Sequence, residues 1–122
     1  MEVKASYNIN PEPMPLVNNT PSVWDSVIQN IRAVDTEYPE KLIALMKERN
    51  EFGKNKYGTY VQIHNGRNSF NDAFQELLDA VVYLYQSYLE TDSDEVYQIY
   101  WNILDNLTFM QEYADYMDNK NE

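Results

Sequence analysis

The sequence predicts an all-α protein, a bundle of four helices. Apolar residues recur at spacings of three and four in four separate segments, as they do on one face of a helix. No two segments alternate apolar and polar residues in the way that a pair of strands would. With 122 residues, of which 43% are hydrophobic, the chain can bury one small core, and the four helices are expected to share it.

The first 21 residues are expected to form an extended arm instead of a helix. Four of the five prolines and four asparagines lie in this stretch, and both residue types disfavour regular structure. The apolar residues Met14 and Leu16 indicate that the second half of the arm packs against another part of the protein. The predicted organisation is therefore an arm at 1–21, a helical domain at 22–117 and a polar tail at 118–122.

The first helix is expected to begin after Thr20 or Ser22, whose side chains can cap it. The second helix is expected to open at Glu40 and to be ended by Gly53 and then Gly58. Its predicted packing face carries a stripe of mainly apolar side chains. These are Leu42, Leu45, Met46, Arg49 and Phe52.

The third helix is expected to follow a glycine-containing loop. Ser69 can act as its N-cap, with Asp72 three residues later as the reciprocating partner. A broad apolar stripe then continues to about Leu89, with an acidic ridge on another face of the helix. The segment Thr91–Asp94 breaks this pattern and caps a fourth helix, which is expected to reach about Met117.

The overall composition is acidic and excludes several classes of protein. A formal net charge of −11 argues against binding to polymeric nucleic acid, because that binding rests on Lys and Arg side chains that meet phosphates. There is no run of 18 apolar residues, so no membrane span is expected, and the N-terminus lacks the apolar stretch of a signal peptide. The absence of cysteine excludes disulfides and thiolate metal sites. The absence of cysteine does not fix the compartment, but nothing in the sequence requires secretion, so we expect a cytoplasmic protein.

Two pairs of acidic residues are notable for their spacing. Glu48 and Glu51 are three residues apart, and so are Glu76 and Asp79. Residues i and i+3 lie on the same face of a helix, so each pair can direct two carboxylates at one place. Hard cations such as Mg²⁺ prefer oxygen ligands of this kind. Because a chain with 20 acidic residues contains such pairs by chance, a solvated acidic face is the alternative interpretation.

The basic residues are concentrated between the two acidic pairs. Five of the nine Lys and Arg residues lie between 47 and 67, a stretch that also contains all three glycines. Such a local cluster can bind the phosphates of a single nucleotide even in an acidic protein. Lys54, Lys56 and Arg67 are the predicted phosphate ligands, and the carboxylates on either side predict a Mg²⁺-dependent nucleotide site.

Several longer stretches of the chain resemble a known family. They are VWDSVI at 23–28, FGKNKYGT at 52–59 and NGRNSFNDAFQELLDAVVYL at 65–84. Together with the two acidic pairs, which 24 residues separate, they resemble the MazG-like all-α nucleoside triphosphate pyrophosphohydrolases, and within these the phage MazZ-type enzymes. The resemblance covers roughly residues 14–90. The sequence departs from the family pattern in residues 33–41, which look inserted, and at His64, where an aromatic residue is expected.

The resemblance implies an activity and a role for each site residue. MazZ-type enzymes hydrolyse dATP and dGTP to the monophosphate and pyrophosphate, and in some phages they serve the replacement of adenine by diaminopurine. The resemblance implies Mg²⁺, for which Mn²⁺ can substitute, and a homodimer or homotetramer in the cytoplasm, that of the host if a phage encodes the protein. The implied metal ligands and catalytic residues are Glu48, Glu51, Glu76 and Asp79, with Glu51 as the first choice to activate water.

Asn18 and Trp24 are the predicted base ligands. Residues ahead of the first helix can fold over a pocket, where an asparagine offers a donor and an acceptor to a purine edge and an indole can stack on it. His64, the single histidine, is a further candidate contact to the substrate. The alternatives are a core position for Trp24 and a polar surface position for His64.

Two interpretations without catalysis stay open. A small acidic helical protein can mimic DNA and inhibit a protein that binds nucleic acid. A mimic needs its acids spread over the surface, and the cations clustered between the acidic pairs argue against that arrangement. The other interpretation is an oligomeric helical bundle without chemistry.

Overall fold

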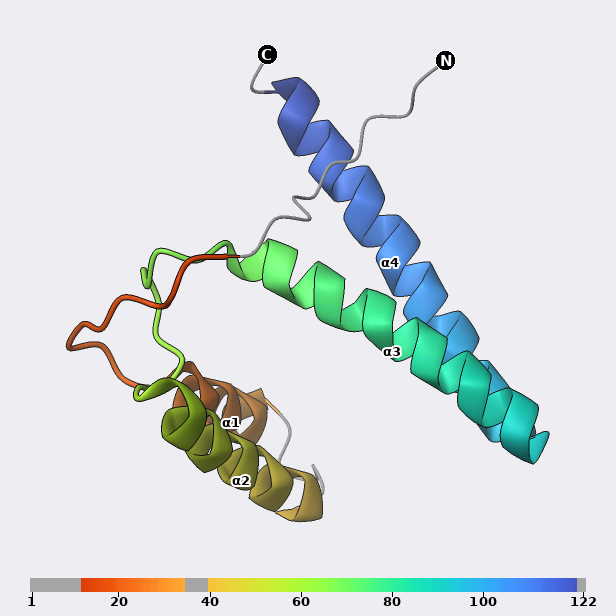
Figure 1. Ribbon diagram of the computed structural model, residues 1–122, viewed down its shortest axis with the longest axis horizontal. Coiled ribbons are helices and arrows are strands. Elements are labelled where there is room, and N and C mark those ends of the chain that lie inside the picture. Colours follow the sequence, from red (N-terminus) through yellow and green to blue (C-terminus); the bar gives the residue numbers. More distant parts are fainter. Residues whose placement is uncertain (1–11, 35–39, 121–122) are drawn as a thin grey trace. The chain divides into compact units, whose positions relative to one another are not determined.

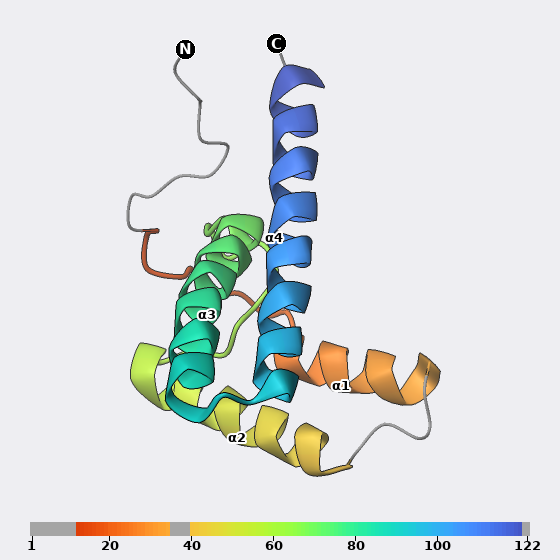
Figure 2. The same ribbon diagram turned by 90° about the vertical axis from the view of Figure 1, so that its right-hand side faces the viewer.

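The computed structural model describes residues 12–34 and 40–120, and within them all regular structure is helical. The all-α class predicted from the sequence is therefore confirmed. The helices form two compact units (Figures 1 and 2): an N-terminal unit, Glu12–Arg67, and a hairpin unit that begins at Asn68. None of the helices in the described ranges is long and apolar enough to cross a membrane. The helices are α1 (Val23–Val34), α2 (Glu40–Tyr57), α3 (Ser69–Thr91) and α4 (Asp94–Lys120).

Parts of three predicted segments lie outside the described residues. They are the first half of the arm (1–11), the centre of the segment that looks inserted (35–39) and the end of the polar tail (121–122). The described part of the arm contains no regular structure before α1, as predicted.

In the hairpin unit, α3 and α4 run antiparallel along each other. Ring pairs fix their alignment. The ring centroids of Phe70 and Tyr113 are 5.5 Å apart, and those of Tyr88 and Tyr97 near the turn are 4.5 Å apart. Phe74 on α3 and Leu107 on α4 are the buried apolar residues of this unit. The hairpin also buries a polar residue, Asn71, which the apolar pattern does not predict.

The two ends of α3 are fixed by local hydrogen bonds. At the start, the Asn68 side chain accepts the backbone N–H of Asn71 at 3.0 Å, so the N-cap is Asn68 and the predicted cap, Ser69, is wrong by one residue. Both side chains can cap a helix, and the extended backbone of Asn68 (φ −85°, ψ 97°) decides between them. At the other end, Asp92 takes a left-handed conformation (φ 53°) and its N–H donates to the Tyr88 carbonyl. Ser93 then caps α4 by accepting the Val96 N–H at 3.3 Å.

In the N-terminal unit, the arm pairs with the loop that follows α2. The Leu16 N–H donates to the Asn65 carbonyl and the Val23 N–H to the Val61 carbonyl, both at 2.7 Å. As residue numbers rise along the arm they fall along the loop, so the two segments are antiparallel. The second half of the arm therefore does contact another part of the protein in this arm–loop pairing (13–23 with 61–67), but through polar groups, since Met14 and Leu16, on which the prediction rested, are 69% and 64% exposed.

The side chain of Gln62 strengthens the arm–loop pairing. Its Nε2 donates to the carbonyls of Asn18 and Thr20, both at 2.6 Å, and its Oε1 accepts the Asn18 N–H at 3.1 Å. One amide group therefore satisfies three backbone groups of an arm that has no helix or strand partner of its own.

The packing of α1 on α2 uses a different face of α2 from the predicted one. The buried residues are Ile28 on α1 and Ile43 and Asn50 on α2. The Ser22 hydroxyl donates to Asn50 Oδ1 at 2.9 Å, and this bond satisfies a polar side chain inside the unit. In the predicted stripe, by contrast, Leu45 is 48% exposed and Phe52 is 54% exposed. A buried asparagine is not recognisable from periodicity, because only its partner Ser22 makes the burial favourable.

The end of α2 also differs from the prediction. The helix continues through Gly53 and ends before Gly58, which has a positive φ of 77° and donates its N–H to the Lys54 carbonyl at 2.8 Å. Gly53 was therefore wrongly assigned to the helix end. Of these two glycines, only Gly58 adopts the left-handed conformation that terminates a helix, whereas Gly53 lies inside α2.

We predict opposite effects for alanine at two glycines of this unit. Gly66 has φ 83°, and a Cβ there would lie 3.1 Å from Leu16 Cδ1, so Gly66→Ala should lower the free energy of unfolding by about 1–3 kcal/mol. Gly53 has nothing within 4 Å of a Cβ, so Gly53→Ala, the matched control, should raise it by about 1 kcal/mol because alanine favours a helix. Urea unfolding followed by circular dichroism measures both. Equal effects would contradict the arm–loop contact.

Candidate metal and nucleotide site

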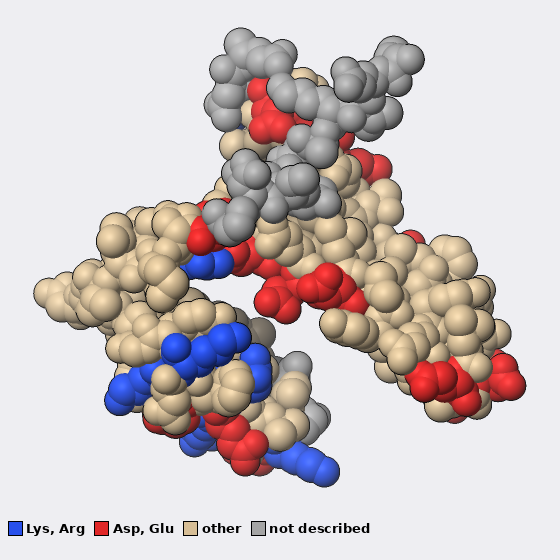
Figure 3. Space-filling view, in the orientation of Figure 1, with Lys and Arg blue, Asp and Glu red and all other residues tan. Residues whose placement is uncertain are grey.

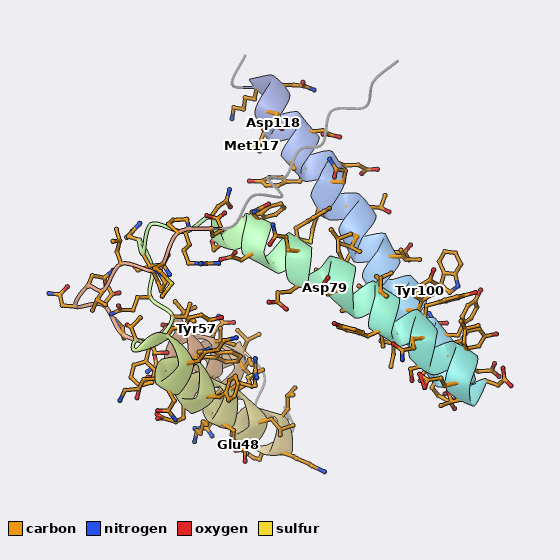
Figure 4. All side chains as sticks on the ribbon, in the orientation of Figure 1. Glu48, Tyr57, Asp79, Tyr100, Met117 and Asp118 are labelled. Carbon is orange, nitrogen blue, oxygen red and sulfur yellow. The ribbon has the colours of Figure 1, made fainter. Side chains whose placement is uncertain are left out.

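The four candidate metal ligands lie on exposed faces of two helices. Glu48 and Glu51 are on α2 in the N-terminal unit, and Glu76 and Asp79 are on α3 in the hairpin unit. Figure 4 labels one residue of each pair, Glu48 and Asp79. Each pair keeps the predicted i, i+3 relation within one helix. Within either unit, the described residues do not bring three or more His, Asp or Glu side chains together.

Within the N-terminal unit, the α2 pair lies away from the helix interface. Ile43 and Asn50 face α1, whereas Glu48 and Glu51 are exposed and lie near Leu45 and Phe52 in sequence, which are exposed as well. The carboxylates are therefore open to a ligand from outside the unit. Glu51 Oε1 accepts a hydrogen bond from the Tyr60 hydroxyl at 2.9 Å.

The α3 pair is exposed to a similar degree. In the described part of the chain, neither Glu76 nor Asp79 accepts a hydrogen bond or forms an ion pair, and the same is true of Glu48. Exposed carboxylate oxygens that no protein cation neutralises are the donors that a hard cation such as Mg²⁺ binds. The chemistry of these side chains therefore fits the metal that the sequence implies.

Two of the predicted phosphate ligands lie in the last turn of α2 and point their cations at tyrosine rings. The Lys54 ammonium is 4.8 Å from the Tyr60 ring centroid, and that of Lys56 is 5.2 Å from the Tyr57 ring centroid. The pKa of Lys54 is raised, first by side-chain hydrogen bonding with Tyr60 and then by electrostatic attraction to Tyr60 and Glu51. Figure 3 shows Lys and Arg side chains gathered over α2. This end of α2 is thus a local cationic surface in an acidic protein.

The third predicted phosphate ligand takes part in the arm–loop pairing. Arg67 Nη1 donates to the Pro13 carbonyl at 2.8 Å, and the side chain is half-buried. The backbone N–H of Arg67 donates to Asn65 Oδ1 at 3.2 Å. The guanidinium of Arg67 therefore has a structural role in the arm–loop pairing.

The predicted base ligand Asn18 is already engaged by its own unit. Its Nδ2 donates to the Ile63 carbonyl at 2.9 Å, and its Oδ1 accepts the Thr20 N–H at 2.9 Å and the Thr20 hydroxyl. An asparagine amide has two N–H donors, so one donor is left for a base edge. Asn18 therefore has a structural role in addition to any role in binding.

Trp24 and His64 are the remaining residues predicted to contact the substrate. Trp24 is the second residue of α1 and is half-buried, and its backbone N–H donates to the Ser22 hydroxyl at 3.3 Å. His64 is exposed in the turn after Ile63 and has a positive φ of 55°. Histidine is one of the residue types that tolerate this left-handed conformation, so the conformation of the turn accounts for a histidine at position 64 without a role in binding.

The sequence analysis missed Tyr60, which contacts two of the predicted site residues. Its hydroxyl bonds Glu51 and its ring lies under the Lys54 ammonium. Helical periodicity does not extend to Tyr60, because the chain turns at Gly58 and Tyr60 lies nine positions after Glu51, beyond the end of α2. Comparisons with protein-family models, with curated proteins and with solved structures find no match to this chain.

We predict that Asn18→Ala destabilises the protein in the absence of any nucleotide. The substitution removes the bonds to Ile63 and Thr20, so the free energy of unfolding should fall by about 1–2 kcal/mol. Asn19→Ala is the matched control, because the side chain of Asn19 is exposed and makes no hydrogen bond in the described part of the chain. Urea unfolding of both variants provides the measurement. If the two variants were equally stable, the structural role of Asn18 would be ruled out.

Proposed function

We propose that this protein is a Mg²⁺-dependent nucleoside triphosphate pyrophosphohydrolase with a MazG-like bundle of the phage MazZ type. Its proposed substrates are dGTP and dATP, in phage nucleotide metabolism that includes diaminopurine-type DNA modification. One observation carries the proposal. Each of two helices, α2 and α3, presents two exposed carboxylates three residues apart, and a cationic surface follows the first pair on α2. Glu76, Asp79 and the two lysines lie within the sequence segments that resemble the family, and Glu48 and Glu51 lie directly before one of them.

The proposed reaction breaks the bond between the α-phosphorus and the oxygen that bridges to the β-phosphorus. A water oxygen attacks the α-phosphorus, its proton passes to a base, and pyrophosphate leaves. Bound Mg²⁺ would offset the triphosphate charge and lower the pKa of the attacking water. Glu48, Glu51, Glu76 and Asp79 would hold the metal, and one of these carboxylates, with Glu51 as the first choice, would orient or deprotonate the water.

The cationic side chains would stabilise the charge that moves onto the leaving pyrophosphate. Lys54 and Lys56 project from the last turn of α2, and Arg67 is held at the far end of the arm–loop pairing. Positioned cations of this kind supply much of the catalysis in phosphoryl transfer. For the base, Trp24 would stack on the purine, Asn18 would offer its remaining amide donor, and His64 is a further proposed contact.

One assay tests the proposed function. The full chain is incubated with each of the four dNTPs and Mg²⁺, and the products are separated. We expect dGTP and dATP to give the monophosphate and pyrophosphate, with dCTP and dTTP as poor substrates, and a chelator to stop the reaction. Equal hydrolysis of pyrimidines would remove the MazZ-type substrate assignment. Absence of any hydrolysis would contradict the proposal that the protein is an enzyme of this class.

We predict that an amide at any of the four carboxylates abolishes turnover. Glu48→Gln, Glu51→Gln, Glu76→Gln and Asp79→Asn should each lower kcat/KM by about a hundredfold or more, because each removes a charged metal ligand. Stability should stay equal or rise, since repulsion between like charges is relieved. Glu112→Gln on α4 is the control, an exposed acid that makes no hydrogen bond or ion pair in the described residues. Normal turnover of Glu76→Gln or Asp79→Asn would contradict the assignment.

We predict a homodimer or homotetramer at micromolar concentration, measured by light scattering. The two helices of the hairpin unit leave several large apolar side chains more than 60% exposed, and monomeric proteins rarely expose large apolar patches. A second copy that covers this surface would bury it at little cost. A monomer at the same concentration would contradict the prediction. The residues concerned are Val82, Tyr83, Leu89, Phe109 and Tyr116.

The charge of the hairpin unit favours the second candidate, an acidic DNA mimic or inhibitor without catalysis. Between residues 69 and 119 the sequence has 11 Asp and Glu and no Lys or Arg. Figure 3 shows acidic patches on the face of α3 and α4 that it presents. A surface of one sign attracts a protein that normally binds a polyanion. The dNTP assay separates the two candidates, because a mimic gives no monophosphate.

A further inference from the structure

Tyr60 connects the arm–loop pairing to a proposed metal ligand. Its hydroxyl donates to Glu51 Oε1 at 2.9 Å, a hydrogen bond to a charged acceptor, which is stronger than a bond between neutral groups. The other carboxylate oxygen of Glu51 makes no hydrogen bond in the described part of the chain, and the Lys54 ammonium is attracted to the same carboxylate. Tyr60 thus holds one oxygen of Glu51 and leaves the other for a cation.

The position of Tyr60 is itself fixed from both sides. The carbonyl of the next residue, Val61, accepts the Val23 N–H at 2.7 Å, which ties the backbone beside Tyr60 to the start of α1. The Thr59 hydroxyl donates to the Tyr60 carbonyl at 3.2 Å, and the Lys54 ammonium lies 4.8 Å from the ring centroid. A hydroxyl placed by the backbone and by a ring contact can restrict a flexible glutamate more than a free surface side chain could.

We propose that Tyr60 is a positioning residue that orients the Glu51 carboxylate for binding the divalent cation. This inference rests on the proposed function, in which Glu51 is a metal ligand. An exposed glutamate samples several rotamers and loses that freedom when it binds a metal. The bond from Tyr60 removes part of this freedom in advance. The bond also withdraws some negative charge from the carboxylate, and the proposal requires that the gain in orientation outweighs this loss of charge.

The test is Tyr60→Phe, which removes the hydroxyl and keeps the ring beneath Lys54. Mn²⁺ binding to the full chain is measured by the electron paramagnetic resonance signal of free Mn²⁺, together with the Mn²⁺ concentration for half-maximal dGTP turnover. Loss of a partner that orients a metal ligand typically costs about tenfold to a hundredfold in affinity or activity. The dissociation constant for Mn²⁺ and the Mn²⁺ concentration for half-maximal turnover should therefore each rise by about tenfold. The melting temperature should not change, because the bond is exposed.

Tyr57→Phe is the matched control, since it removes a hydroxyl from a neighbouring exposed tyrosine that makes no hydrogen bond in the described residues (Tyr57 is labelled in Figure 4). Its Mn²⁺ affinity should equal that of the unaltered protein. In a Glu51→Gln background, Tyr60→Phe should have no further effect on Mn²⁺ affinity, because the two residues act as one unit. A loss of equal size in that background would show that Tyr60 does not act through Glu51.

The outcomes separate this inference from the proposed function. If the unaltered protein hydrolyses dGTP and binds Mn²⁺ but Tyr60→Phe behaves like Tyr57→Phe, the role of Tyr60 is overturned and the enzyme remains. If the unaltered protein neither hydrolyses a dNTP nor binds Mn²⁺, the proposed function fails and the role of Tyr60 fails with it. Weaker Mn²⁺ binding by Tyr60→Phe alone supports both.

Discussion

The N-terminal unit depends most on the hydrogen bonds that the side-chain amide of Gln62 makes. The arm and the loop that meet at this side chain have no helix or strand of their own, so their backbone groups need partners from elsewhere in the chain. Gln62 provides three of these bonds, and backbone bonds at Leu16 and Val23 provide two more. The hydrogen bonds between these two irregular segments therefore satisfy backbone groups that would be paired in a β-sheet in other proteins.

The arm–loop pairing fixes the positions of several candidate site residues. It holds Arg67 at one end and the backbone beside Tyr60 at the other, and Asn18 is part of it. Through Tyr60 the same pairing reaches Glu51 at the exposed side of α2. Surface carboxylates are usually mobile, and a chain of contacts that ends on one of them gives it a defined position.

The cores of the two units are small, and this affects how the protein is stabilised. Among the described residues, the buried apolar side chains are Ile28 and Ile43 in one unit and Phe74 and Leu107 in the other. Hydrogen bonds such as Ser22–Asn50 and ring contacts such as Tyr88–Tyr97 therefore contribute a larger share of the specificity than in a thick core. Folded proteins are marginally stable in any case, so a ligand or a second copy that binds only the folded state would stabilise this one noticeably.

The helices and the i, i+3 relation within each acidic pair could be predicted from the amino-acid sequence, because both depend on the local period of the backbone. Tertiary structure decided what depends on partners distant in the sequence. Which face of α2 packs was set by α1 and by the bond from Ser22 to Asn50, 28 residues away. The engagement of Asn18 by a loop more than 40 residues later, and the contact of Tyr60 with Glu51 across the end of α2, follow from chain reversals that no periodic pattern records.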